Sequence, residues 1–200
     1  MGVYMQAALE AVNFIDAQRL EGRTKWRRAD DAGGSDYGLY HGSSGIILLL
    51  LEVHAATGSA QALEQAIAAG EEVAAHLGRV DRLSVSASTG WPGYAFAMSE
   101  LARVSGREDF RALAGTCLQR LRDQAKPLGA GIGWIEPAPF SEITGFTGER
   151  EIYDQSVGAA GAGLVMLYGD RNDLHPEALD WAMAVGERLL EVAESDPDGL

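Results

Sequence analysis

Residues 42–51 read Gly-Ser-Ser-Gly-Ile-Ile-Leu-Leu-Leu-Leu. The run after the second glycine is apolar almost all round, which indicates a helix buried on most of its sides. Residues 94–101 and 159–167 are similarly poor in charge, and each run also begins at a pair of glycines. The glycines of the three pairs are Gly42, Gly45, Gly90, Gly93, Gly158 and Gly161. Because the two glycines of a pair share one helical face, we expect a close approach to a neighbouring backbone there.

Four other segments show the pattern of helices with one apolar face. Apolar residues recur in steps of three and four within residues 4–15, 63–77, 110–125 and 179–193, and polar residues cover the opposite side. Buried helices therefore alternate with amphipathic ones along the chain. This alternation predicts an all-α fold in which an inner layer of helices is wrapped by an outer one, with fewer than about one residue in ten in strands.

The residues that end one helix and begin the next also recur, which supports a repeat. Gly58 and Gly106 follow two of the charge-poor helices and are expected to close them in the left-handed conformation. Ser59 and Asp109 then stand at the start of the next helix, as a cap or a first-turn acid. The Gly/Pro-rich residues 128–148 predict a long ordered loop. A pair of helices that recurs along the chain, each time after a glycine pair, indicates a solenoid or a closed toroid. We expect an α/α toroid formed by a single domain over residues 1–200.

Composition excludes several classes of partner. The chain has 16 basic and 29 acidic residues, a net charge of −13, which repels nucleic acid and anionic lipid surfaces. The single cysteine, Cys117, excludes an intrachain disulfide framework and fits a reducing compartment. Residues 1–20 do not have the pattern of a signal peptide, and the longest apolar run, Ile46–Leu51, is too short to span a bilayer. A cytoplasmic location and no membrane partner are expected.

Several sequence segments resemble the N-terminal half of lanthionine synthetase C-like proteins. Leu39–Glu52 looks like the first inner helix of that family, and Ser88–Leu101 is similar to the second. Tyr153–Gly161 resembles the third, where the family carries an aspartate four residues ahead of the first glycine. Trp26 and Gly131–Trp134 stand where such proteins place tryptophans before a repeat. The similarity covers nearly the whole chain.

The resemblance implies a fold and an activity. The family fold is a toroid of seven inner and seven outer helices, and three inner helices with about four outer ones form roughly half of it. Residues 1–200 are therefore expected to be the first three repeats plus the next outer helix of an incomplete toroid. The family activity is zinc-dependent thioether formation, in which a peptide cysteine adds to a dehydrated serine or threonine. A peptide is thus the implied substrate.

This chain departs from the family at the metal. The family's zinc ligands are two cysteines and a histidine in later repeats, and the sequence contains no Cys-His pair. Cys117 falls on the apolar face of an amphipathic helix, which predicts a buried, inert thiol. His54, His76 and His175 show no spacing to another ligand. We expect no zinc in this chain and no thioether formation by it alone, with zinc bound only in a missing C-terminal half.

Most of the candidate functional residues stand close to a glycine pair in the sequence. The resemblance assigns a catalytic role to Asp154, whose alternative role is to cap the helix that begins near Gly158. Tyr153 and His41 are candidates to line the substrate cavity that the resemblance implies. The alternative for Tyr153 is a half-buried structural side chain, and the alternative for His41 is a hydrogen-bonded structural histidine. Trp91 and Trp134 are candidates for an aromatic wall that contacts a peptide or a sugar, with core packing as the alternative.

Two other functions remain open at this stage. One is a non-catalytic helical scaffold that binds a peptide or a partner protein on its concave face. The other is a helical-toroid carbohydrate hydrolase, which requires a pair of acidic side chains. The acidic residues of the long insertion are most simply a solvated surface, but they include candidates for such a pair. These residues are Glu136, Glu142, Glu149 and Glu151.

Half of a ring has open edges. The flanks of the first and last buried helices, near Leu49 and Val165, are expected to be apolar. Leaving about 500 Å² of such surface in water forgoes roughly 12 kcal/mol, so we expect a second copy or a separate C-terminal half to cover it. Residues 195–200 fit a boundary between two repeats, which favours the separate half.

Overall fold

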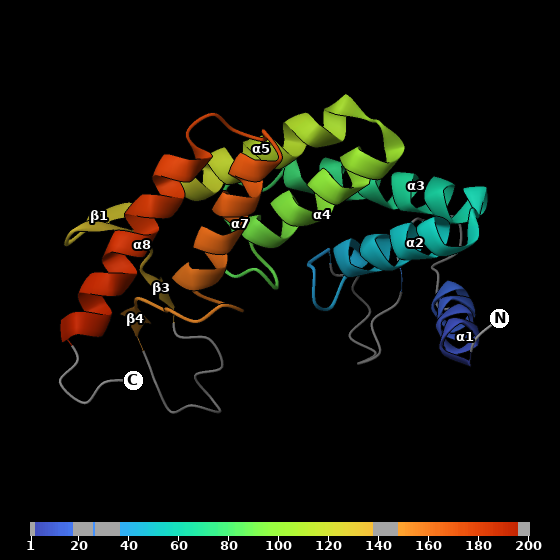
Figure 1. The fold of residues 1–200 in the computed structure, drawn as a ribbon, viewed down its shortest axis with the longest axis horizontal. Coiled ribbons are helices and arrows are strands. Elements are labelled where there is room, and N and C mark those ends of the chain that lie inside the picture. Colours follow the sequence, from blue (N-terminus) through green and yellow to red (C-terminus); the bar gives the residue numbers. More distant parts are fainter. Residues whose placement is uncertain (1–2, 18–25, 27–36, 138–147, 196–200) are drawn as a thin grey trace. The chain divides into compact units, whose positions relative to one another are not determined.

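The computed structural model describes residues 3–17, 26, 37–137 and 148–195. Within these residues it shows seven α-helices and four short strands, so the all-α prediction is confirmed. The helices are α1 (Val3–Ala17), α2 (Ser43–Thr57), α3 (Ala60–Leu77), α4 (Trp91–Ser105), α5 (Glu108–Asp123), α7 (Ala159–Arg171) and α8 (Ala178–Ser195). The strands are β1 (Lys126–Leu128), β2 (Gly131–Gly133), β3 (Glu136–Pro137) and β4 (Glu149–Arg150). Figure 1 shows their course.

The chain forms two compact units. The first contains Met1–Val80 and Ala97–Arg111, and the second contains Asp81–Phe96 and Ala112–Leu200. Helices α4 and α5 contribute residues to both units. None of the helices in the described ranges combines the length and the apolarity needed to cross a membrane.

The first unit is organised around the pairing of α2 with α3. Gly58 ends α2 in the left-handed conformation (φ 73°), and Gly106 ends α4 in the same way (φ 70°). The Ser59 hydroxyl accepts a hydrogen bond from the Ala62 N–H at 3.2 Å and thereby caps α3. Asp109 lies in the first turn of α5. The predicted helix ends and helix starts are therefore confirmed at these positions.

In the second unit α7 packs against α8, and α8 also contacts β2. The absence of a side chain at Gly163 allows close packing, since a Cβ there would lie 3.3 Å from Val185. Strands β1 and β2 form one antiparallel pair, and β3 and β4 form another. The stretch predicted to be a long ordered loop thus contains short strands. Residues 138–147 of it lie outside the described residues.

The residues just before a charge-poor helix, which we call its leading loop, fold back onto the helix start. The Trp91 N–H donates to the Ser84 carbonyl at 3.3 Å, and the Ala159 N–H donates to the Ile152 carbonyl at 2.7 Å. In two loops the next residue of the helix makes a bond of the same kind, again to a carbonyl seven residues upstream. The Ser44 N–H donates to the Tyr37 carbonyl and the Ala160 N–H donates to the Tyr153 carbonyl, both at 3.2 Å. The three leading loops are therefore structural repeats, and α2, α4 and α7 begin at the predicted glycine pairs.

Lack of space for a side chain explains four of the six glycines, namely Gly45, Gly90, Gly158 and Gly161. A Cβ at Gly90 would lie 1.9 Å from the Ser84 carbonyl oxygen, and one at Gly161 would lie 2.0 Å from that of Gln155. The backbone at Gly158 is extended (φ −130°), a conformation open to any residue. The predicted close approach is confirmed, but the neighbouring backbone belongs to the helix's own leading loop.

Cys117 is fully buried in the apolar face of α5. Burial raises the pKa of its thiol to about 12, because the interior disfavours the thiolate. The predicted burial of this thiol is therefore confirmed, and its raised pKa is consistent with the low reactivity that the sequence predicts.

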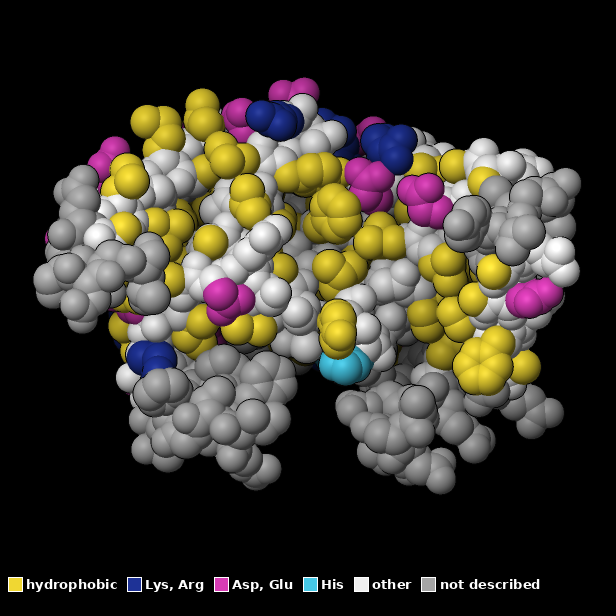
Figure 2. Space-filling model, turned by 60° about the horizontal axis from the view of Figure 1, so that its bottom comes forward, with side chains coloured by type: hydrophobic (Ala, Val, Ile, Leu, Met, Phe, Trp, Pro, Cys, Tyr) yellow, Lys and Arg dark blue, Asp and Glu magenta, His cyan; other side chains and the backbone are white. Residues whose placement is uncertain are grey.

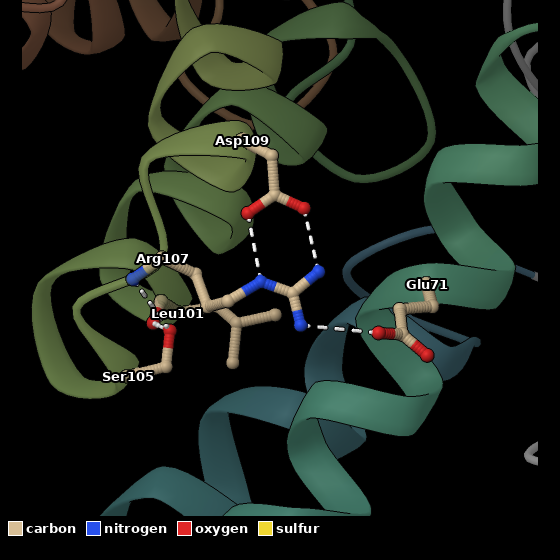
Figure 3. A network of polar contacts seen from close by, with 5 residues as sticks. All are labelled: Glu71, Leu101, Ser105, Arg107 and Asp109. Carbon is tan, nitrogen blue, oxygen red and sulfur yellow. Dashed lines mark hydrogen bonds and ion pairs between the residues drawn. The ribbon is translucent and has the colours of Figure 1, made fainter.

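An exposed ion-pair network joins α3 to the start of α5 (Figure 3). The Arg107 guanidinium donates two hydrogen bonds to the Asp109 carboxylate, at 2.8 and 2.6 Å, and a third to Glu71 at 3.1 Å. The bidentate bond to Arg107 lowers the pKa of Asp109 from 3.8 to about 2.

We expect this network to stabilise the fold only while Asp109 is ionised. A carboxyl whose pKa is lower in the folded state contributes stability above its unfolded pKa and loses it as the pH falls through the folded value. The free energy of unfolding should therefore fall between about pH 4 and pH 2, and Asp109→Asn should reduce that fall. Denaturant titrations across this range measure it, and an identical pH profile in the variant would contradict the role of the network.

The glycine geometry predicts opposite outcomes for two alanine substitutions. Gly161→Ala places a methyl group against a backbone carbonyl and should destabilise the protein by about 1–3 kcal/mol. Gly186 has open space around its Cβ position in the middle of α8, so Gly186→Ala should stabilise by about 0.5–1 kcal/mol. Chemical denaturation of both variants is the measurement. Equal effects would show that the leading loop does not impose the glycine.

Candidate functional site

The candidate site is built on the leading loop of α7, residues 151–158. The Asp154 carboxylate lies in this loop and accepts hydrogen bonds from the N–H groups of Ser156 at 2.7 Å and Val157 at 2.9 Å. Both bonds reach Oδ1, so neither of them uses Oδ2. The residue is exposed. The prediction that this carboxylate reaches the amides near Gly158 is confirmed, while its catalytic role stays a prediction.

The leading loop of α4 performs the same structural task without a carboxylate. Ser86 stands four residues before Gly90, as Asp154 stands before Gly158. Its hydroxyl accepts hydrogen bonds from the N–H groups of Ser88 at 3.0 Å and Thr89 at 3.4 Å. The α4 loop therefore folds with an uncharged hydrogen-bond acceptor at this position, and the negative charge of Asp154 is additional.

The leading loops of α4 and α7 lie side by side. The Ser86 hydroxyl and the Ser88 N–H both donate to the Ser156 carbonyl, each at 3.3 Å. A Cβ at Gly161 would also contact the Ala87 side chain at 3.6 Å. The starts of α4 and α7 are thus at the same end of the second unit, and Asp154 lies there.

Tyr153 precedes Asp154 and is held by its hydroxyl. The side chain is 37% exposed, and its O–H donates to Glu151 Oε2 at 3.1 Å. Partial burial and the bond to Glu151 both raise the pKa of the phenol. Glu151 in turn forms a bidentate ion pair with Arg188 of α8, which lowers the pKa of the Glu151 carboxyl. Tyr153 is therefore a protonated donor at neutral pH.

The two tryptophans that were candidates for an aromatic wall do not present an exposed surface. Trp91 and Trp134 are core residues, nearly inaccessible to solvent, so neither exposes an indole face for the aromatic wall that the sequence suggested. The Trp134 Nε1–H donates to the Leu121 carbonyl at 3.0 Å, and Arg120 lies over the Trp91 ring at 5.1 Å. Core packing is therefore the correct alternative for both tryptophans.

His41 belongs to the first unit. Its side chain is exposed and meets the Tyr40 ring edge-on, with 4.6 Å between the ring centroids. Its role in lining a cavity stays a prediction.

The interpretation of the acidic insertion as a solvated surface is wrong at two positions. Glu136 is buried, and burial raises the pKa of its carboxyl, while Arg82 and the Val85 backbone act in the opposite direction. Glu151 is ion-paired with Arg188, so its carboxylate is not free for an acid–base pair with Glu136. Glu149 is exposed in β4, and Glu142 lies outside the described residues.

The described residues do not fit a catalytic zinc ion. No three His, Cys, Asp or Glu side chains in the described ranges come together where they could hold a metal. The thiol of Cys117 is buried in apolar surroundings and stays protonated. His175 Nδ1 accepts a hydrogen bond from the Glu177 N–H at 3.2 Å, and His54 Nδ1 lies 2.9 Å from the Ser59 carbonyl oxygen, so neighbouring backbone groups engage these two ring nitrogens.

Sequence reasoning missed Ser86 and Arg188. Ser86 could have been found by aligning the leading loops on their glycine pairs, since it occupies the position of Asp154. Arg188 carries no such signal, because it lies 37 residues from its partner Glu151 on a different element.

We compared the chain with models of known protein families. The model of lanthionine synthetase C-like proteins matches residues 33–198, which include all three glycine pairs and Asp154. A search of curated proteins found no match.

Proposed function

Because the chain belongs to the lanthionine synthetase C-like family, we propose that it binds a dehydrated, cysteine-containing peptide as part of a thioether-forming cyclase. The observation that carries this proposal is the carboxylate of Asp154. The α4 loop shows that a hydroxyl suffices for the fold, so the charge at Asp154 is available for a substrate. In an exposed loop at the start of α7, Oδ2 can accept a hydrogen bond or a proton from a bound peptide.

The chemistry to be served is a conjugate addition. The sulfur of a peptide cysteine forms a bond to the β-carbon of a dehydrated residue, and the proton lost by the thiol is balanced by one gained at the α-carbon. We propose Asp154 as a residue that takes part in this proton transfer. The zinc of complete family members is proposed to be bound by residues outside this chain, because the described residues do not fit it. The chain alone is therefore proposed to bind peptide without closing the thioether ring.

The test separates the charge of Asp154 from its role in the loop. Asp154→Ser copies the α4 loop, and Asp154→Asn keeps a capping side chain, so both should lower the free energy of unfolding by less than about 1 kcal/mol. Both should weaken binding of a peptide with one dehydroalanine and one cysteine by about tenfold or more, because a bond to an ionised group is worth about 1.5–3 kcal/mol. Fluorescence anisotropy with a labelled peptide measures the affinity.

Asp109→Asn is the matched control, since it removes the same charge from the first unit. Its affinity for the peptide should equal that of the parent. Absence of peptide binding by the parent, or one affinity for all variants, would retire the proposal. Alkylation of the peptide thiol after incubation shows whether the ring has closed, and we expect the cysteine to remain free.

A non-catalytic scaffold that binds a peptide or partner protein is the second candidate. It is favoured by the lack of a metal-ligating cluster among the described side chains. Peptide binding that is unaffected by Asp154→Ser would support it over the cyclase.

We also propose that the apolar face of α7 and α8 is an interface for a further helix pair of a family toroid. Leu164 and Leu167 of α7 are 49% and 40% exposed, next to the predicted edge at Val165. Leu179, Met183 and Leu190 of α8 are also exposed. Figure 2 shows hydrophobic side chains on the surface in its left half, where α7 and α8 lie in Figure 1. Exposed apolar clusters of this kind mark interfaces.

Without that helix pair, two copies of the chain should meet at this face. Light scattering should show self-association of the parent, and the double substitution Leu164→Glu/Leu167→Glu should reduce it. Gln61→Glu/Ala75→Glu, which adds two charges on the exposed side of α3, should leave self-association unchanged. A stable, well-behaved parent monomer would contradict the interface.

A further inference from the structure

Three elements of the second unit meet at Arg188 of α8. Its Nε donates to Glu151 Oε1 at 3.0 Å, its Nη2 donates to Glu151 Oε2, and its Nη1 donates to Glu191 Oε2 at 2.8 Å. Glu191 also accepts the Ala130 N–H from the β1–β2 turn at 2.9 Å. One guanidinium therefore joins α8, the β1–β2 hairpin and the leading loop of α7.

This network is more protected from water than an ordinary surface ion pair. The side chains of Arg188 and Glu151 are 19% and 13% exposed, whereas those of Arg107 and Asp109 are 39% and 59% exposed. Exposed pairs contribute little because water screens them. In a partly buried pair, removal of one partner leaves the other charge uncompensated, so the geometry is held more strongly.

The fold of a leading loop does not itself require this ion pair. Leu83 occupies, seven residues before Gly90, the position that Glu151 occupies before Gly158. The α4 loop, with a leucine there, makes the bonds Trp91 N–H to Ser84 and Gly90 N–H to Ser86, which match Ala159 to Ile152 and Gly158 to Asp154 in the α7 loop. Its Leu83 carbonyl and the Trp91 Nε1–H both face the Gln124 side-chain amide, which satisfies both when its nitrogen is turned to Leu83. The charges at Glu151 and Arg188 are thus an addition specific to the loop that carries Asp154.

We propose that Arg188 is a positioning residue for the α7 leading loop. Through Glu151 it holds the Tyr153 hydroxyl, and the fixed backbone at Tyr153 presents the next residue, Asp154, at the start of α7. This inference rests on the proposed function of Asp154. It adds a residue from a different helix to the machinery that orients that carboxylate.

The direction in which the pKa of Tyr153 changes in Arg188→Ala distinguishes a positioning role from a purely electrostatic effect. In an unchanged loop, loss of the Arg188 charge beside the phenol raises the pKa of Tyr153. If Arg188 holds the loop, Arg188→Ala instead releases Tyr153 from Glu151 into water, and its pKa falls toward the ordinary value. The pKa is measured by NMR of ring-labelled tyrosine, with Tyr153→Phe to assign the signal.

Loop order is read independently from backbone amides. The N–H groups of Ser156 and Val157 bond to Asp154, and their hydrogen exchange should become at least about tenfold faster in Arg188→Ala. Arg188→Lys, which keeps the charge but not the bidentate fork, should give an intermediate rate. Arg107→Ala, which breaks the comparable bidentate pair in the first unit, should change neither exchange at Ser156 nor the pKa of Tyr153.

A double substitution guards against misfolding of the single variants. Glu151→Leu/Arg188→Met removes both charges at once and copies the leucine of the α4 loop, so no unpaired charge is buried. We expect it to fold, to show fast exchange at Ser156 and Val157, and to lose peptide affinity to the extent that Asp154→Ser does. A folded double variant with parental exchange and parental affinity would overturn the proposal, as would a raised pKa of Tyr153 in Arg188→Ala.

The outcomes separate this inference from the proposed function. The pKa and the exchange rates are measured without peptide. If they change as expected but the parent binds no peptide, the function fails and the positioning role stands. If the parent binds peptide and the loop is unaffected by the Arg188 variants, only the positioning role fails.

Discussion

The return of each leading loop onto its own helix start is the constraint on which the rest of the structure depends. The carbonyl oxygen six residues upstream lies where a Cβ would otherwise be, within 1.9 Å at Gly90 and 2.3 Å at Gly158. A side chain at either position would push the loop away and break the backbone bonds to the first turn. The geometry of the leading loop therefore requires glycine at these positions, and the recurrence of the glycines marks the repeat.

Much of the fold was predictable because its determinants are local. Apolar residues in steps of three and four predicted the amphipathic helices, and Gly58 and Gly106 marked two helix ends. The burial of Cys117 followed from its place on an apolar face. The contact of Asp154 with nearby amides followed from its position ahead of a helix. Each of these predictions depends on residues within a few positions of one another.

The errors concern partners that are distant in the sequence. Glu151 looked solvated because its counter-charge is on α8, and Glu136 looked solvated although the structure buries it. Trp91 and Trp134 looked like candidates for a ligand wall because sequence alone does not show which side of an aromatic ring is covered. The candidate site was thus predicted at Asp154 and Tyr153, but the charged network behind them was not.

The three leading loops also show that the repeat keeps its fold when the side chain at one position changes. Four residues before the first glycine, the loops carry Gly38, Ser86 and Asp154. The hydroxyl of Ser86 makes the local bonds that the carboxylate of Asp154 makes, so the backbone tolerates a change of charge at this position. The loop that carries the carboxylate is also the one in which an arginine from a distant helix pairs with a glutamate three residues before the aspartate. Neither addition is needed for the backbone bonds that the α4 loop forms without them. We therefore propose that the two act together, with the arginine supporting the carboxylate that the proposed function requires.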